Sequence, residues 1–252
     1  MDMCSERDTR RISFTEVLSM EKKANVLAYI LYYSLIISAL LASSYGISTA
    51  ATVMAQITPL EGRTCIIIDA GHGGIDGGTT SCTGILESHI NLQVSLRLND
   101  MLHLLGYQTK MIRTTDVSVY TEGDSIAAKK VSDLKHRVKI VNDTENALLI
   151  SIHQNYFEDG RYSGSQVFYN KEGEGLSKEL QKDFIFNLGS PGTRQAKAAK
   201  GIYLMEKVNC PAALIECGFL SNPEEEAKLR DAAYQKNLCS VIACVISRYL
   251  NT

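Results

Sequence analysis

Two histidines and two glutamates occupy comparable positions in the sequence and could act together in one reaction. His72, His153 and Glu216 each follow closely on an apolar run, and Glu87 begins a segment with the apolar spacing of a helix. Two imidazoles and one carboxylate, with a fourth position open, are typical ligands of hydrolytic zinc sites. Such a site also needs a carboxylate that is not bound to the metal and acts as general base. These residue types therefore predict a metal-dependent hydrolase.

Each of the four residues also has a structural explanation when it is taken alone. A histidine between glycines, as at His72, could be a turn residue, and His153 could be a hydrogen-bonded core histidine. Glu87 could be a helix-start carboxylate that the helix macrodipole favours. Glu216 is harder to explain, because a charge at the end of an apolar run is rarely buried unless it is paired or bound. The prediction depends on whether the fold brings the four together.

The chain after residue 60 alternates apolar runs typical of strands with segments of helical period. Strands are expected over residues 64–70, 107–113, 147–152, 165–169, 201–205 and 212–215. Helices are expected over residues 87–105, 132–142, 175–188, 223–230 and 234–249. This order predicts a single α/β domain with a mixed, largely parallel sheet and helices on both faces. Because ligands bind beyond the carboxyl ends of parallel strands, the four side chains should meet in one crevice.

Composition and charge exclude several other classes of protein. The 252 residues are 45% hydrophobic and 21% charged, which is the composition of an ordinary globular chain. The formal net charge is −2. No excess of positive charge is available to neutralise phosphates, so nucleic acid is not an expected partner.

The first 60 residues are expected to direct the chain to a membrane rather than to join the fold. Residues 26–47 are mostly apolar and long enough to span a bilayer, and no charged residue occurs from residue 24 to residue 60. Two lysines precede this segment, which predicts a cytoplasmic N-terminus and a catalytic domain, residues 61–252, outside the membrane. Two alternatives remain: an uncleaved signal anchor, and a signal peptide that is cleaved. In both cases the domain is exported, either anchored to the outer face of the cytoplasmic membrane or secreted.

Several separated blocks of sequence carry a resemblance to a known family. The blocks IIIDAGHGG, GILESHINL, LLISIHQN and PAALIECGFLSNPEE occur in this order between about residues 64 and 250. They closely resemble the zinc-dependent N-acetylmuramoyl-L-alanine amidases of bacterial cell-wall turnover. The resemblance implies that His72, Glu87 and His153 bind one Zn²⁺ per chain and that Glu216 is the catalytic carboxylate.

The resemblance also implies a substrate and further site residues. The family hydrolyses the amide that joins the lactyl group of N-acetylmuramic acid to the L-alanine of the peptidoglycan stem peptide. Arg137 and Asn155 lie in recurrent blocks of the family, which implies a structural or substrate-positioning role for Arg137 and a contact with the substrate for Asn155. Two alternatives stay open: a related zinc exopeptidase, and a peptidoglycan-binding or regulatory protein without catalysis.

The organisation of the chain is similar to that of one branch of the family. A single catalytic domain behind an N-terminal membrane segment resembles the germination-specific amidases of endospore formers, which act on cortex peptidoglycan in the formation of muramic-δ-lactam. This resemblance implies a role in sporulation and germination, in the intermembrane space around the forespore. It also implies a possible accessory or activator protein, which no motif in the sequence identifies.

Overall fold

The structure, a computed structural model, describes residues 34–38 and 63–251. Residues 34–38 form a helical turn. The apolar segment expected over residues 26–47 lies for the most part outside the described residues. Within the described residues, no helix has the length and the apolar character that a membrane crossing requires.

Six strands form one sheet in the order β2-β1-β3-β6-β4-β5. In chain order they are β1 (Cys65–Ala70), β2 (Gln108–Met111), β3 (Ala147–Asn155), β4 (Gln166–Tyr169), β5 (Lys197–Ala198) and β6 (Ala212–Phe219). Strands β2, β1, β3 and β6 are parallel, whereas β4 pairs antiparallel with β6. β1 is buried along its whole length, as expected of an apolar run at the centre of a parallel sheet. The predicted mixed, largely parallel sheet is confirmed.

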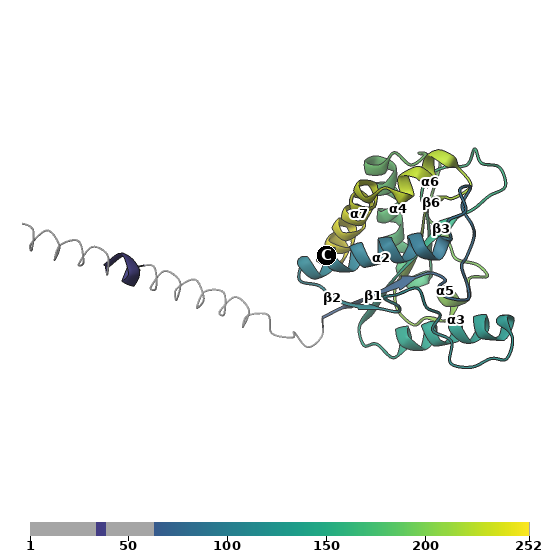
Figure 1. Ribbon diagram of the computed structural model, residues 1–252, viewed down its shortest axis with the longest axis horizontal. Helices are drawn as coiled ribbons and strands as arrows, with labels where there is room; N and C mark the ends of the chain where they lie inside the picture. Colours follow the sequence, from purple (N-terminus) through teal and green to yellow (C-terminus); the bar gives the residue numbers. More distant parts are fainter. Residues whose placement is uncertain (1–33, 39–62, 252) are drawn as a thin grey trace, which may run out of the picture. The chain divides into compact units, whose positions relative to one another are not determined.

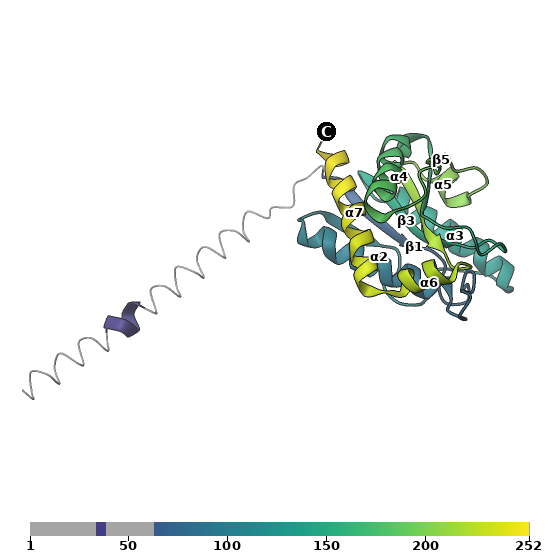
Figure 2. The same cartoon turned by 90° about the horizontal axis from the view of Figure 1, so that it is seen from above.

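Helices cover both faces of this sheet (Figures 1 and 2). They are α2 (Glu87–Leu104), α3 (Ile126–Asn142), α4 (Glu174–Leu188), α5 (Tyr203–Lys207), α6 (Pro223–Arg230) and α7 (Ala232–Leu250), with a 3₁₀ turn η1 (Lys171–Gly173) before α4. α2, α4 and α7 pack on one face of the sheet, over a core that includes Ile66 and Ile68, and α3 and α5 pack on the other, over Ile67. The alternation along β1 follows the two-residue period of a strand.

One expected strand is a helix in the structure, and one short strand was not expected. The strand expected over residues 201–205 is wrong, because Tyr203–Lys207 is the short helix α5. Its Leu, Met, Glu and Lys residues have high helix propensity, and the buried Leu204 and Met205 pack against the sheet from one side of the helix. β5, which the sequence analysis did not predict, consists of two exposed residues and has no apolar alternation.

Two strands extend further than expected, and this affects the site. β3 continues to Asn155 and β6 to Phe219, past the apolar runs that identify them. His153 and Glu216 are therefore members of paired strands rather than of the loops after them. They are direct Cα partners across β3 and β6.

Candidate metal centre

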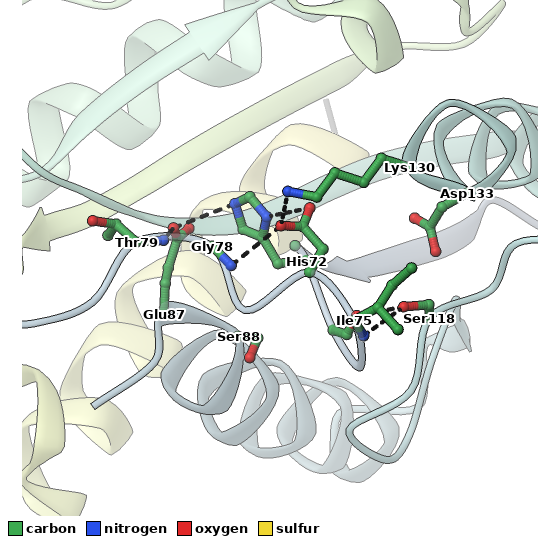
Figure 3. Close-up of polar contacts among 12 residues, drawn as sticks. His72, Ile75, Gly78, Thr79, Glu87, Ser88, Ser118, Lys130 and Asp133 are labelled. Carbon is green, nitrogen blue, oxygen red and sulfur yellow. Dashed lines mark hydrogen bonds and ion pairs between the residues drawn. The ribbon is translucent and has the colours of Figure 1, made fainter. Parts of the chain in front are cut away.

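The loop after β1 is built to present the ring of His72. His72 has a φ of 59°, a left-handed conformation that is uncommon for residues other than glycine. Its Nδ1 lies 2.9 Å from Oδ2 of Asp76, and Lys130 on α3 pairs with the other oxygen of this carboxylate at 2.8 Å. The contact with Asp76 leaves Nε2 of His72 directed at Glu87 (Figure 3). Carboxylate partners of this kind commonly orient metal-binding histidines.

Glu87 is fixed from several sides at the first residue of α2. Its Oε1 accepts hydrogen bonds from the amide group of Asn91 and the backbone N–H of Gln154, each at 3.1 Å. Its Oε2 accepts one from the backbone N–H of Thr79, also at 3.1 Å. The side chain is 5% exposed, so its orientation depends on these donors rather than on solvent. Both oxygens remain directed at the two histidines.

His153 completes a group of three possible ligands. Its Nδ1 lies 3.1 Å from Oε1 of Glu87, and Nε2 of His72 lies 3.3 Å from Oε2. One donor atom from each of the three residues lies within 4.8 Å of the other two. A Cβ at Gly71 would lie 2.3 Å from the His153 ring, so the backbone approaches this ring as closely as only glycine permits.

The pKa values in this group describe a site suited to a cation. Burial alone would raise the pKa of Glu87, but hydrogen bonds from His153 and His72 hold it well below its usual range. Burial alone would lower the pKa of His72, but the hydrogen bond and charge of Glu87, followed by those of Asp76, raise it to about 9. The carboxylates thus favour positive charge at the point where the three donors meet.

Glu216 lies next to this group without joining it. Its Oε2 is buried and has no hydrogen-bond partner within the described part of the chain. Burial raises the pKa of this carboxyl to about 7; the charge of Glu87 adds to the shift, while His153 and His72 oppose it. A buried carboxylate without a partner is costly, which is typical of a group held for a ligand or a reaction.

Three of the four predicted residues line one cavity, and the fourth contacts two of these three. A cavity of about 430 Å³ is lined by His72, His153 and Glu216, and Glu87 contacts both histidines at its wall. The sequence-based expectation that the four side chains lie together thus agrees with the geometry. The roles assigned to them remain proposals.

Arg137 and Asn155 lie in different surroundings. Arg137 lines the same cavity, but its guanidinium is buried and donates to Asp133, to Asp69 and to the main-chain carbonyls of Ala70 and His72. These contacts fit a residue that positions the His72 loop. Asn155 lies at the end of β3 and lines a second cavity. The substrate-binding role implied for the two residues stays a prediction.

Sequence reasoning missed the residues that support the group. Asp76 holds His72, and Asn91 holds Glu87 while also donating to the main-chain carbonyl of Gly71. Asn91 could have been found, because it lies four residues after Glu87 and so faces the same side of α2. Asp76 had no such signal, because its contact depends on the conformation of a glycine-rich loop.

Comparisons with known proteins agree with this geometry. The model of the N-acetylmuramoyl-L-alanine amidase family matches residues 66–248. The germination-specific N-acetylmuramoyl-L-alanine amidase of Bacillus subtilis is 38% identical over 234 residues, which cover 91% of this chain and 96% of the relative.

Solved structures show the same fold. The structure of the CwlD amidase from Clostridioides difficile in complex with the GerS lipoprotein matches with a TM-score of 0.72 and 35% identity, over 75% of this chain and 99% of that one. The N-acetylmuramoyl-L-alanine amidase AmiC2 of Nostoc punctiforme matches with a TM-score of 0.66 and 26% identity, over 76% and 99% of the two chains. The chain belongs to the N-acetylmuramoyl-L-alanine amidase family.

Proposed function

We propose that this protein is a zinc-dependent amidase that hydrolyses the bond between N-acetylmuramic acid and the L-alanine of peptidoglycan stem peptides. The observation that carries the proposal is the buried, unpartnered Oε2 of Glu216 beside three side chains whose donor atoms lie within 4.8 Å of one another. A carboxylate next to such a group, but outside it, has the position of a general base.

His72, Glu87 and His153 fit a zinc ion by the chemistry of their donors. Two imidazoles and a carboxylate are common ligands of catalytic zinc, and hydrogen bonds to Asp76 and Asn91 hold two of these side chains in place. A zinc ion held by these residues would supply a Lewis acid for the scissile carbonyl and would lower the pKa of water.

The protein's own residues then move the proton. Glu216 accepts a proton from the attacking water at its free Oε2 and delivers it to the departing alanine nitrogen. Arg137 holds the His72 carbonyl and Asp76 holds its ring while the charge at the reaction centre changes. The rigid sheet positions Glu216 beside His153, so little reorganisation is needed during the reaction.

We also propose a biological setting for this reaction. The likeness to a germination-specific amidase supports a role in spore cortex maturation and germination. The uncharged stretch from residue 24 to residue 60 supports an exported domain on the outer side of the cytoplasmic membrane, with the forespore intermembrane space as its site of action. The relative found with a lipoprotein supports an accessory protein for this chain as well.

Mass spectrometry of peptidoglycan digests tests the enzymatic function. The zinc-loaded protein is incubated with purified peptidoglycan, and free stem peptides that begin with L-alanine are the expected product. Cleavage inside the peptide would instead indicate an exopeptidase. No cleavage with one equivalent of zinc bound, and none after an extract of sporulating cells is added, would contradict the proposed function.

Loss of the metal ligands provides a second test. His72→Ala and His153→Ala are each expected to lose zinc together with activity, because two remaining ligands hold the ion weakly. Zinc content is measured by atomic absorption. Full zinc retention in both variants would remove the two histidines from the proposed site.

A further inference from the structure

A second cavity, of about 630 Å³, opens beside the candidate metal centre. Gln166 lines it from β4 and is the Cα partner of Glu216 on β6. Asn155 and Phe219, which are Cα partners across β3 and β6, also line it. The cavity therefore starts one strand away from the carboxylate that we assign to proton transfer.

Positive charge distinguishes this cavity. Its charged lining residues are Arg161, Arg194 and Lys197, and no carboxylate is among the lining residues. Arg161 pairs with Asp159 at 2.7 Å. Arg194 and Lys197 form no ion pair within residues 63–251. Two cations are thus available to a ligand.

Arg194 is held in place by the protein rather than left free in solvent. Its Nε donates to the main-chain carbonyl of Ser163 at 2.9 Å, and its Cζ lies 4.8 Å from the centre of the Phe219 ring. Its Nη1 reaches Oε1 of Gln166 at 3.4 Å, and its Nη2 has no partner in the described chain.

The electrostatic surroundings of Arg194 favour an anion. Burial lowers the pKa of its guanidinium, and only the charge of Glu225 opposes this effect. Oε2 of Glu225 already accepts hydrogen bonds from the backbone N–H groups of Gly164 and Phe219. A carboxylate that entered the cavity would supply the missing charge and could accept two parallel hydrogen bonds from the guanidinium.

The walls around Arg194 are tightly packed. A Cβ at Gly164 would lie 2.2 Å from Cδ of Pro191, so the two loops that carry Ser163 and Arg194 are in close contact. The backbone N–H of Ser165 donates to Oγ of Ser190 at 3.1 Å and joins the same two loops. The cavity is a formed feature of the fold.

We propose that this cavity binds a carboxylate of the peptide that leaves when the amide is cut. Arg194 is the principal contact, and Lys197 adds positive charge. The inference rests on the amidase function proposed above. Every stem peptide has at least its C-terminal carboxylate, so the leaving side of the substrate is anionic. The cationic cavity orients the substrate by attracting this side. Arg194 is thus a determinant of substrate specificity.

Steady-state kinetics with matched substrates test the proposal. The full chain is assayed on a muramoyl-peptide and on versions in which one carboxylate at a time is amidated. We expect the protein to prefer the parent substrate over one amidated version by about 10- to 100-fold in kcat/KM, the usual range for a hydrogen bond to a charged group. In Arg194→Gln this preference should fall to less than about threefold, mainly through KM.

Two further variants separate the subsite from general effects. Lys197→Gln alters an exposed side chain of β5 that forms no ion pair within residues 63–251, and it should reduce the same preference by about two- to fivefold. Arg248→Gln removes an equal charge from α7, where Arg248 pairs with Asp183, and should leave the preference unchanged. An equal loss on all substrates in Arg194→Gln, or an unchanged preference in both Arg194→Gln and Lys197→Gln, would overturn the proposal.

A binding measurement keeps the subsite distinct from the enzymatic function. The free stem peptide and its amidated versions are titrated calorimetrically into the original protein and into Arg194→Gln. If amidation of the peptide or the Arg194→Gln substitution weakens binding about tenfold, the subsite is supported even if the protein cuts no muramoyl-peptide. Equal binding by both proteins, or no binding by either, overturns the subsite even if cleavage is observed.

Discussion

Nη2 of Arg137 donates a hydrogen bond to the main-chain carbonyl of His72 at 2.7 Å and so connects α3 to the candidate metal centre. Because His72 has a φ of 59°, its backbone conformation costs of order 1–3 kcal/mol and persists only where the surroundings hold it. Arg137 holds the carbonyl and Asp76 holds the ring. The loop is thus prepared for a ligand before one binds.

Replacing Arg137 should therefore weaken metal binding without removing a ligand. Arg137→Lys keeps the charge but loses the fork that reaches Asp69, Asp133 and the His72 carbonyl together. We expect zinc affinity to fall about 10- to 100-fold, as for other residues that orient metal ligands. Competition with a chelator measures the affinity. An affinity equal to that of the original protein would show that the loop does not depend on Arg137.

Replacing Glu216 should separate catalysis from metal binding. Glu216→Gln has nearly the same shape but cannot accept the proton, so hydrolysis should fall by at least about 10²-fold. Zinc content and binding of the sugar-peptide should stay close to those of the original protein. Product release and metal analysis on the same preparation check both expectations. Unchanged hydrolysis would remove Glu216 from the mechanism.

Asp69 should make stability depend on acid pH. It is 1% exposed, and although burial would raise its pKa, the charge of Arg137 and hydrogen bonds from Ser151 and Arg137 hold the pKa below its usual value. A carboxyl with a depressed folded-state pKa stabilises the fold above its unfolded pKa, about 3.9, and loses this contribution as the pH falls through the folded-state pKa.

Asp69→Asn tests this dependence. At pH 7 it should lower the free energy of unfolding by about 3–5 kcal/mol, because it breaks a buried ion pair from one side. The difference between the two proteins should narrow as the pH falls below about 4. Urea unfolding over a series of pH values measures it. A difference that stays constant down to the acid limit of folding would contradict the assignment.

Gly71→Ala should damage the site more than the fold. The added Cβ would lie 2.3 Å from the His153 ring and would displace it, so zinc binding and activity should fall. Gly175→Ala is the matched control, since its Cβ would meet only Tyr249 at 4.0 Å and should leave zinc binding unchanged. Zinc content and thermal unfolding of the two variants are compared. Normal zinc binding in Gly71→Ala would show that the ring can move without loss.

The sequence was most informative where an apolar run and a chemical group adjoin. His72, His153 and Glu216 follow runs that become β1, β3 and β6, and three parallel neighbouring strands place their ends at one edge of the sheet. Glu87 could be predicted for a similar reason, because α2 begins at that edge. These positions follow from periodicity and topology alone.

Other parts depended on interactions that no local pattern encodes. α5 is too short for a helical period, and β5 is two exposed residues that pair with β4 only once the fold is present. Arg194 lies in a loop whose place is set by contacts with residues about 30 positions earlier, such as Ser163. Asp76 and Arg137 act on His72 through loop geometry. The sequence therefore predicted the candidate functional residues better than the residues that hold them in place.

The place of β6 between β3 and β4 also has a consequence for when activity can arise. Glu216 is supplied by one of the last elements of the chain, whereas His72, Glu87 and His153 precede it. Chains are made from the N-terminus, and the sheet stays incomplete until β6 has paired with β3 and β4. A chain that ends before β6 would thus have the three proposed ligands without the proposed base, so the order of synthesis would keep an unfinished chain inactive.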